Sequence, residues 1–405
     1  MAVHIHLLHN SLSSFHSHPY GEAIAYIEAL KAMGGTATIY ANTACDSRIL
    51  HDLKALPIFP CATDSMVDTN PSSAEQSEFV SLGNAFGSAL ANHLPKEFTP
   101  EEIIYIPYAR QNEAHGVALW LKTIPADKRP KIVLFCYRPE FRWSLNDDRT
   151  RFEGNFTYWR AVGSELIEQL DSKNILLAST DHRLSAALQA ASGIKALTVK
   201  MPTLYPLDPA ILLAQTRDID VGLLGTYRPE RGSQFLINII KLVDTRHPGL
   251  RYLVQVQNSS DFEQLKTTLN ALRFQGNLEV LIGNPDQTEY MQHLSRCMLS
   301  CLPYAPARYA TRSSGVLSEC AAYGISMVIP ANTWLSDRLD AGEISALKFE
   351  YWTPEAIATC IEIALSNIGP MTERAKYLSH AWRKQNNAQR VLEDIFSELK
   401  LGLEK

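Results

Sequence analysis

The sequence predicts an α/β protein of two doubly wound domains that face each other, followed by C-terminal helices. Three observations lead to this fold class. Short apolar runs alternate with amphipathic stretches, as expected for strands joined by helical crossovers. The alternation stops near residue 205, in TLYPLDP, and then restarts. The length of 405 residues suits two or three domains of ordinary size.

The first half reads as alternating strands and helices. The first expected helix, 21–35, has Ala25, Leu30 and Met33 at helical spacing and ends at two glycines. The polar stretch from about 60 to 78 is expected to be a loop. The expected strands are 3–9, 36–41, 102–108, 131–137, 174–180 and 195–202, and the further expected helices are 112–122, 157–170 and 181–192.

The second half repeats this pattern and then becomes almost entirely helical from Pro354 onward. The expected strands are 218–225, 251–257, 278–283, 297–304 and 325–331, and the expected helices include 232–247 and 314–324.

Such alternation implies right-handed crossovers and parallel sheets covered by helices on both faces. We therefore expect an N-terminal domain over 1–205, a C-terminal domain over 206–370, and final helices over 371–405. Ligands of such folds bind beyond the carboxyl ends of the strands. With two domains, the site is expected in the cleft between them.

Composition excludes several classes of protein. The apolar fraction of 46% and charged fraction of 20% are those of a globular chain. A net charge of −5 argues against nucleic acid as a partner. The seven cysteines show no Cys-x-x-Cys spacing, no run approaches the length of a membrane span, and the first residues lack a signal-peptide pattern. We expect buried thiols and a soluble, cytoplasmic protein.

Two loops carry the residues best suited to bind an anion. In GLLGTYRPERG, a strand ends at Gly225 and the following loop presents Arg228 and Arg231 beside a helix start. The alternative is a solvated turn in which these arginines pair with Glu230 or Asp220.

The second loop precedes the helix that begins near Ser314. Here Arg308 and Arg312 lie before Ser314 and Gly315, where free backbone N–H groups and a small residue would let a phosphate approach. Glu319, one turn further on, could accept hydrogen bonds from a ribose. The alternative is a serine N-cap followed by a surface glutamate.

These two loops, in this order, resemble the donor-binding half of nucleotide-sugar glycosyltransferases of the GT-B fold. The chain is most similar to the large retaining family that includes sucrose synthases and many bacterial cell-surface transferases. The family has GxxxPEKG where this chain has GTYRPERG, and EALAxGxPVV where this chain has SECAAYGISMVIPA. In the first half, the segment PYGEAIAYIEALKAMGG is similar to the family's first helix.

The resemblance implies two Rossmann-like domains, with the acceptor bound by the first and the nucleotide sugar by the second. The final helices would pack back onto the first domain. Arg231 matches the lysine that neutralises the donor diphosphate, and Glu319 matches the glutamate that holds the ribose hydroxyls. Ser314 and Gly315 fall where backbone amides meet the phosphates.

The chain departs from the family at two positions. Thr226 stands where an arginine usually follows the first glycine, so Arg228 would substitute for it. Thr311 stands where a second glutamate often reads the transferred sugar.

Histidines are concentrated at the N-terminus, at positions 4, 6, 9, 16 and 18. A metal site is the weaker interpretation, because a two-residue spacing of histidines is a poor zinc signal. In inverting GT-B enzymes a histidine of this loop is the general base, so His16 and His18 are candidate catalytic residues. Retaining relatives have a histidine after a later strand, where this chain offers Tyr137, Arg138 and Glu140.

Other features favour structural roles. His115 is expected on a helix surface or in a contact between helix and sheet, and Asp181 and His182 are expected as a helix cap and a solvated side chain. The stretch from 141 to 160 is rich in aromatic residues, which could stack on a sugar acceptor or pack in the core of the domain. They are Trp143, Phe156, Tyr158 and Trp159.

The sequence thus predicts a metal-independent glycosyltransferase, with Arg231 stabilising the leaving diphosphate. The match of the second half favours retention at the sugar, and the position of the histidines leaves inversion as the alternative. Its partners would be a nucleotide sugar, a carbohydrate, lipid-linked or protein acceptor, and a second copy of the chain, with no cofactor beyond the donor. The alternatives are a nucleotide-sugar epimerase or sugar phosphorylase on the same fold, or a non-catalytic binding module.

Overall fold

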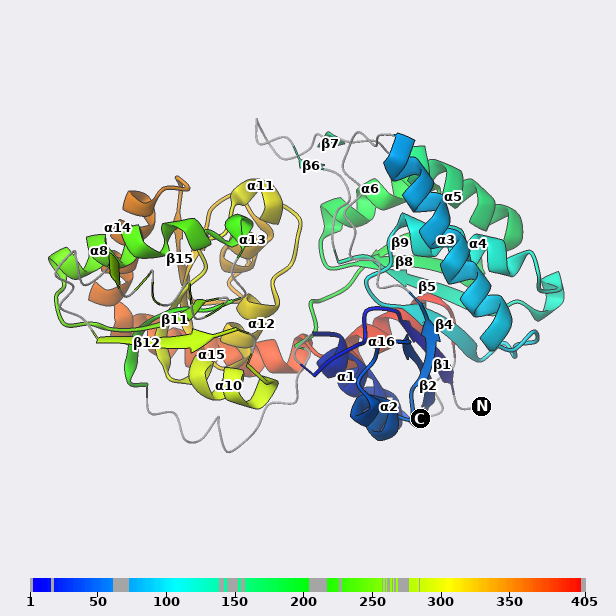
Figure 1. Cartoon of the computed structure of the whole chain (residues 1–405), viewed down its shortest axis with the longest axis horizontal. Helices are drawn as coiled ribbons and strands as arrows, with labels where there is room; N and C mark the ends of the chain where they lie inside the picture. The colour runs from blue at the N-terminus through cyan, green and yellow to red at the C-terminus, as the bar shows by residue number, and fades with distance from the viewer. Residues whose placement is uncertain are drawn as a thin grey trace. The chain divides into compact units, whose positions relative to one another are not determined.

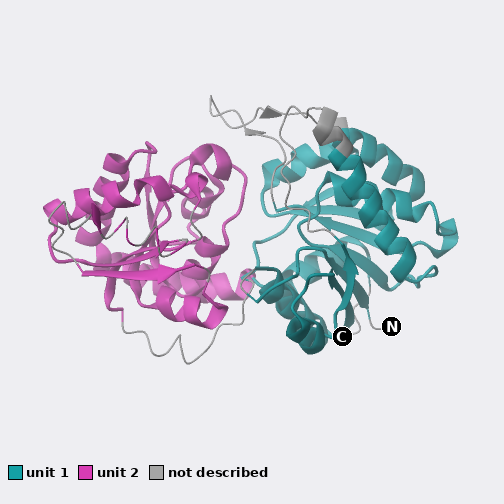
Figure 2. Ribbon diagram, in the orientation of Figure 1, with its two compact units in different colours: residues 1–205, 387–405 teal, residues 206–386 magenta. Residues whose placement is uncertain are grey.

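The computed structural model describes residues 3–15, 18–60, 73–137, 142–143, 152–153, 157–203, 217–225, 228–256, 277–283 and 285–401, with a few positions between 258 and 268. The chain divides into two compact units (Figure 2). Unit 1 comprises residues 1–205 and 387–405, and unit 2 comprises residues 206–386.

Unit 1 contains a seven-stranded parallel sheet in the order β3-β2-β1-β4-β5-β8-β9 (Figure 1). The strand order reverses between β1 and β4, so the carboxyl ends of these two strands form a topological switch point, where doubly wound folds bind ligands. The strands are β1 His4–His9, β2 Thr36–Asn42, β3 Leu56–Phe59, β4 Glu102–Ile106, β5 Lys131–Phe135, β8 Ile175–Ser179 and β9 Ala196–Thr198.

The helices of unit 1 form two packed groups. Four of them pack in sequence on the largest core of the unit: α3 Ser73–His93, α4 Gln111–Leu121, α5 Thr157–Gln169 and α6 His182–Ser192. The other group pairs α1, His18–Ala32, with α16, Ala388–Glu398, while α2 is the short helix Ser47–Leu53. A small antiparallel pair joins β6, Arg142–Trp143, and β7, Phe152–Glu153.

Unit 2 contains a six-stranded parallel sheet in the order β12-β11-β10-β13-β14-β15. Its strand order also reverses once, between β10 and β13. The strands are β10 Ile219–Leu223, β11 Arg251–Val256, β12 Asn277–Ile282, β13 Cys297–Cys301, β14 Ser326–Pro330 and β15 Ala346–Phe349.

Helices α8, Leu236–Arg246, and α14, Pro354–Ser366, pack together over one core of unit 2. Helix α12, Gly315–Ala322, packs instead against α15, Ile368–Gln385. The remaining helices of the unit are α10 Gln287–Ser295, α11 Pro306–Tyr309 and α13 Trp334–Asp340.

The expected loop over residues 60–78 is wrong from Ser73 onward, because helix α3 begins there. Glycines allow α3 to pack very closely on α4. A Cβ at Gly87 would lie 2.7 Å from the Gly116 carbonyl oxygen, and one at Gly116 would lie 2.6 Å from that of Gly83. Glycine weakens an isolated helix, so the sequence signal for α3 is poor and the close packing with α4 stabilises the helix instead.

The C-terminal helices divide between the two units. Helix α15 packs on α12 of unit 2, whereas α16 packs on α1 of unit 1. The structural boundary therefore lies at Asn386–Asn387 and not at the expected residue 371, because the apolar side chains of α15 are matched to unit 2.

Among the residues that the structure describes, no helix has the length and apolar character needed to cross a membrane. The six cysteines in these ranges are buried.

Candidate functional site

The switch point of unit 2 brings together the two loops singled out in the sequence. The first leaves β10 at Gly225 and turns through a short 3-10 helix, Pro229–Arg231. The second leaves β13 and runs to the start of α12. A backbone hydrogen bond of 2.9 Å from Ala305 N–H to the Glu230 carbonyl joins them.

Two glycines permit this arrangement. Gly225 has φ +127°, and a Cβ there would lie 2.9 Å from Arg231 Nη1, so only glycine lets the guanidinium approach the end of β10. Gly232 has φ +74°, and a Cβ there would overlap the Pro303 carbonyl oxygen. That oxygen also accepts a hydrogen bond of 2.9 Å from Trp352 Nε1.

Two arginines of the loops lie on the faces of two stacked tyrosines. The Arg231 guanidinium lies 5.8 Å from the centre of the Tyr304 ring, and Arg312 lies 5.0 Å from that of Tyr309. The two rings stack with their centres 4.3 Å apart. Cation–π contacts therefore hold both positive charges while leaving guanidinium N–H groups available to an anion.

The alternative interpretation, in which the arginines pair with Glu230 or Asp220, is wrong for the described part of the chain. Neither Arg228 nor Arg231 forms an ion pair with a carboxylate among the described residues, and Asp220 accepts instead a hydrogen bond of 2.7 Å from the Arg251 backbone N–H. Arg228 contributes its backbone N–H to Ser233 Oγ at 3.0 Å. The carboxyl that Arg231 influences is that of Glu319, whose pKa it lowers without forming an ion pair.

Helix α12 begins beside this charge. Ser314 is its N-cap, and its Oγ accepts from the Leu317 backbone N–H at 3.2 Å. Helix geometry gives no internal partner to the N–H groups of Gly315 and Val316. The expected serine cap is therefore present, and it still leaves backbone donors for an anion at the positive end of the helix dipole.

Glu319 is only 3% exposed, in contrast to the surface glutamate of the alternative interpretation. Burial raises the pKa of its carboxyl to about 7, against the opposing effects of Arg231 and the Tyr290 hydroxyl. Its Oε2 atom is buried and has no hydrogen-bond partner within the described residues.

Four other positions singled out in the sequence give a mixed result. His18 is exposed at the start of α1, while His16 and Thr226 lie outside the described residues. Thr311, at the position of the missing acid, is fully buried.

Sequence reasoning missed a buried polar group at the switch point of unit 1. His9, the last residue of β1, has its Nε2 3.2 Å from Glu22 Oε2, and both side chains are wholly buried. Tyr137 Oη donates to Glu22 Oε1 at 2.8 Å. The sequence contained a weak signal, the glutamate Glu22 followed by the largely apolar residues of α1. Because His9 is enclosed, it is placed to orient its neighbours and not to touch a substrate.

His4 and His6 extend from β1 toward neighbouring strands. His6 Nε2 lies 3.1 Å from Glu102 Oε1, and His4 Nδ1 lies 2.8 Å from Thr36 Oγ1. Burial lowers the pKa of both imidazoles. Across the described ranges, no group of three or more His, Cys, Asp or Glu side chains is arranged to hold a metal ion.

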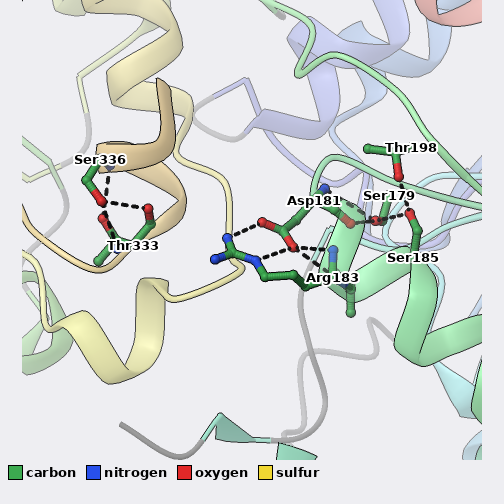
Figure 3. A network of polar contacts seen from close by, with 8 residues as sticks. Ser179, Asp181, Arg183, Ser185, Thr198, Thr333 and Ser336 are labelled. Atoms are coloured by element: carbon green, nitrogen blue, oxygen red, sulfur yellow. Dashed lines mark hydrogen bonds and ion pairs between the residues drawn. The ribbon is translucent and has the colours of Figure 1, made fainter. Parts of the chain in front are cut away.

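The helix cap expected at Asp181 is confirmed, whereas His115 contacts neighbouring helices and not the sheet. His115 lies in a helix contact, with Nδ1 3.3 Å from Glu165 Oε2. Asp181 caps α6 by accepting from the backbone N–H groups of Arg183 and Leu184 at 2.9 and 3.1 Å. Its carboxylate also binds the Arg183 guanidinium in a two-bond geometry (Figure 3). His182 is exposed, as expected.

Two of the four candidate stacking aromatics pack inside unit 1. Trp159 is 2% exposed in the core, and Tyr158 lies 4.3 Å from Phe79, ring centre to ring centre. The Trp143 side chain and Phe156 lie outside the described residues, as do Arg138 and Glu140.

Comparison with known proteins places this geometry in a recognised fold. No protein-family model and no curated protein sequence matches the chain. Solved structures match over nearly its whole length. A glycosyltransferase from Rickettsia africae has a TM-score of 0.64 at 12% identity, covering 98% of this chain and 99% of that one. Anabaena HepE in complex with UDP-glucose has a TM-score of 0.60 at 12% identity, covering 98% and 99%.

A third structure, OtsA without ligand, has a TM-score of 0.63 at 13% identity and covers 99% of this chain and 100% of that one. Together with the two doubly wound sheets, these matches define the class: the chain has the GT-B fold of nucleotide-sugar glycosyltransferases. At this identity the likeness establishes the fold, and activity must be argued from the site itself.

Proposed function

We propose that this chain is a glycosyltransferase that takes its sugar from a nucleotide-diphosphate donor bound by unit 2. The observation that carries the proposal is the stack of Arg231, Tyr304, Tyr309 and Arg312 beside the start of α12. It concentrates positive charge that is not ion-paired with a carboxylate among the described residues, and it does so at a topological switch point, where this class of fold binds ligands. HepE, which shares the fold, has been solved with UDP-glucose.

In the proposed reaction, the sugar–phosphate bond breaks and negative charge develops on the leaving diphosphate. Arg231, Arg312 and the backbone N–H groups at Gly315 would stabilise that charge. Such preorganised donors usually make the largest contribution to this kind of catalysis. Because arginine and backbone groups supply the positive charge, we propose a reaction that needs no metal. Arg228 would take the role of the arginine that the similar family usually has at the position of Thr226.

The first test is thermal unfolding in the presence of UDP, GDP, ADP, CDP or TDP. A diphosphate at 100 times its dissociation constant adds about 2.7 kcal/mol to the free energy of unfolding. We expect one of the five to stabilise the protein, and Arg231→Ala to abolish the shift. The matched control is Arg246→Ala, which removes an exposed arginine paired with Glu362. If no diphosphate stabilises the protein, the proposal fails and a non-catalytic module is favoured.

The second test is turnover with the nucleotide sugar so identified. Removing one preorganised charge of this kind typically costs about 100- to 1,000-fold in turnover, so Arg231→Ala should be nearly inactive while remaining folded. Turnover of the nucleotide sugar without any acceptor would indicate an epimerase, and a requirement for inorganic phosphate would indicate a phosphorylase. EDTA should leave the rate unchanged.

The similarity of the second half to the retaining family favours retention at the anomeric carbon, which the proton coupling constant of the product would test. In unit 1, exposed His18 and its neighbour His16 remain the candidates to act on the acceptor hydroxyl. Replacing His18 with alanine should lower turnover without changing the nucleotide-induced shift in melting temperature, because donor binding is assigned to unit 2.

A further inference from the structure

Four buried polar atoms at the switch point of unit 2 have no hydrogen-bond partner among the described residues. They are Arg231 Nε, Tyr290 Oη, Tyr304 Oη and Glu319 Oε2. Native proteins pair nearly all buried polar atoms, so a group of unpaired ones calls for a partner that is not part of the chain. The four side chains form one group, because the Arg231 guanidinium lies 5.8 Å from the centre of the Tyr304 ring, while Glu319 raises the pKa of Tyr290 and both Tyr290 and Arg231 lower that of Glu319.

The four atoms divide by chemistry. Arg231 Nε and Tyr304 Oη both donate, which suits the phosphate oxygens already assigned to this loop. Glu319 Oε2 accepts when the carboxyl is ionised, whereas Tyr290 Oη is a hydroxyl that burial and the charge of Glu319 keep protonated by raising its pKa. An acceptor and a donor side by side suit one ligand hydroxyl, which can donate to the first and accept from the second.

Tyr290 comes from α10, a helix that sequence reasoning did not connect with the site. Its hydroxyl acts directly on Glu319, because it opposes the rise in the pKa of that carboxyl. Glu319 lies four residues, or about 6 Å of helix, beyond Gly315 at the start of α12. A nucleotide whose phosphates meet the helix start would thus bring its ribose to Glu319 and Tyr290.

We propose that Tyr290 is a ribose-binding residue, which with Glu319 encloses a single hydroxyl of the donor ribose and so selects ribonucleotides over deoxyribonucleotides. This inference rests on the proposed function, because it requires a nucleoside diphosphate in unit 2. It assigns to Tyr290 a role that the two sequence motifs do not contain.

The test compares dissociation constants for UDP, 2′-deoxy-UDP and 3′-deoxy-UDP, or for the same three forms of whichever base the thermal screen selects. We expect the wild type to bind one of the deoxy forms about 10-fold more weakly than the ribose form, the loss expected for a hydrogen bond to a charged group. Tyr290→Phe should bind the ribose form about 3- to 10-fold more weakly than the wild type does, and it should bind that deoxy form as the wild type does. The ratio of the two dissociation constants should therefore fall.

Glu319→Gln should also lower the ratio of the dissociation constants for the deoxy and ribose forms. The double variant, Tyr290→Phe with Glu319→Gln, should lose less binding free energy for the ribose form than the sum of the two single losses, because both side chains hold the same hydroxyl. The control is Tyr377→Phe, which removes an exposed hydroxyl of α15 and should change neither constant. Without ligand, Tyr290→Phe should melt no lower than the wild type, since the variant no longer buries an unpaired hydroxyl, and this offsets the lost interaction with Glu319.

The inference is overturned if Tyr290→Phe weakens the ribose and deoxy forms equally, which would indicate a purely structural role, or if it changes neither. It is also overturned if the unliganded variant melts well below the wild type. Failure of the proposed function gives a different result, because the wild type itself would then bind none of the three forms.

Discussion

Gly232→Ala, compared with a matched control, should separate two contributions to the free energy of unfolding. One is backbone strain, and the other is displacement of the loop that carries Arg228 and Arg231. Residue 232 has φ +74°, so any side chain there first incurs the left-handed penalty of about 1–2 kcal/mol. The new Cβ would also overlap the Pro303 carbonyl oxygen and lie 3.0 Å from the Pro303 Cβ. Backbone cannot move aside as a flexible side chain can, so one of the two loops must shift.

The shift would disrupt two hydrogen bonds of 2.9 Å, from Ala305 N–H to the Glu230 carbonyl and from Trp352 Nε1 to the Pro303 carbonyl. At about 1 kcal/mol for each bond, Gly232→Ala should cost about 3–4 kcal/mol in total. It should also weaken nucleotide diphosphate binding by at least about 10-fold, or 1.4 kcal/mol, because Arg231 moves with the loop.

Gly249→Ala is the matched control in the same unit. Residue 249 also has a positive φ, +89°, but nothing lies within 4 Å of a Cβ there. Only the strain of about 1–2 kcal/mol should remain, with nucleotide binding unchanged. Urea unfolding of both variants measures the difference. Equal destabilisation by the two substitutions would refute the reasoning, as would a Gly232→Ala variant with undiminished affinity for the diphosphate.

Three further predictions concern unit 1. Because burial lowers the pKa of His4 and His6, the folded protein binds their protons less readily than the unfolded chain, and stability should fall as pH drops below about 6.5. Replacing both with glutamine should flatten the fall between pH 6.5 and 5 in urea titrations, and an unchanged slope would contradict this assignment. Asp181→Ala removes a helix cap and the partner of a part-buried arginine and should cost about 2–4 kcal/mol, whereas Asp171→Ala, at an exposed cap, should cost clearly less. Glu22→Ala leaves two buried groups without their partner and should cost at least about 2–4 kcal/mol, measured as a fall in the urea midpoint; a loss below 1 kcal/mol would mean that water replaces the carboxylate.

Parallel strands and their helices were readily predicted from the sequence, because a strand buried on both faces is a continuous apolar run. KIVLFCY and NILLAST are of this kind and became β5 and β8. The helix α3 was not predictable in the same way. Its small residues and glycines weaken the periodic signal, and only contact with α4 makes glycine the favourable choice at positions 83, 87 and 116.

The residues of the candidate site likewise include some that the sequence predicts and some that it does not. Gly225, Arg231 and Ser314 occur in short segments whose order of strand end, basic loop and helix start is visible in the sequence. The sequence could not identify the role of Tyr290 or the contact between His9 and Glu22, because each depends on side chains that distant parts of the chain bring together.

The sequence by itself determined the two doubly wound units and the two loops that we propose to bind an anion, since periodicity and helix-start chemistry are local properties. Only the tertiary structure decided that α15 belongs with unit 2 and α16 with unit 1, and that aromatic rings rather than carboxylates hold Arg231 and Arg312. It also decided that Glu319 is buried among unpaired polar atoms. Burial and charge pairing depend on which distant side chains become neighbours, and a linear pattern does not contain that information.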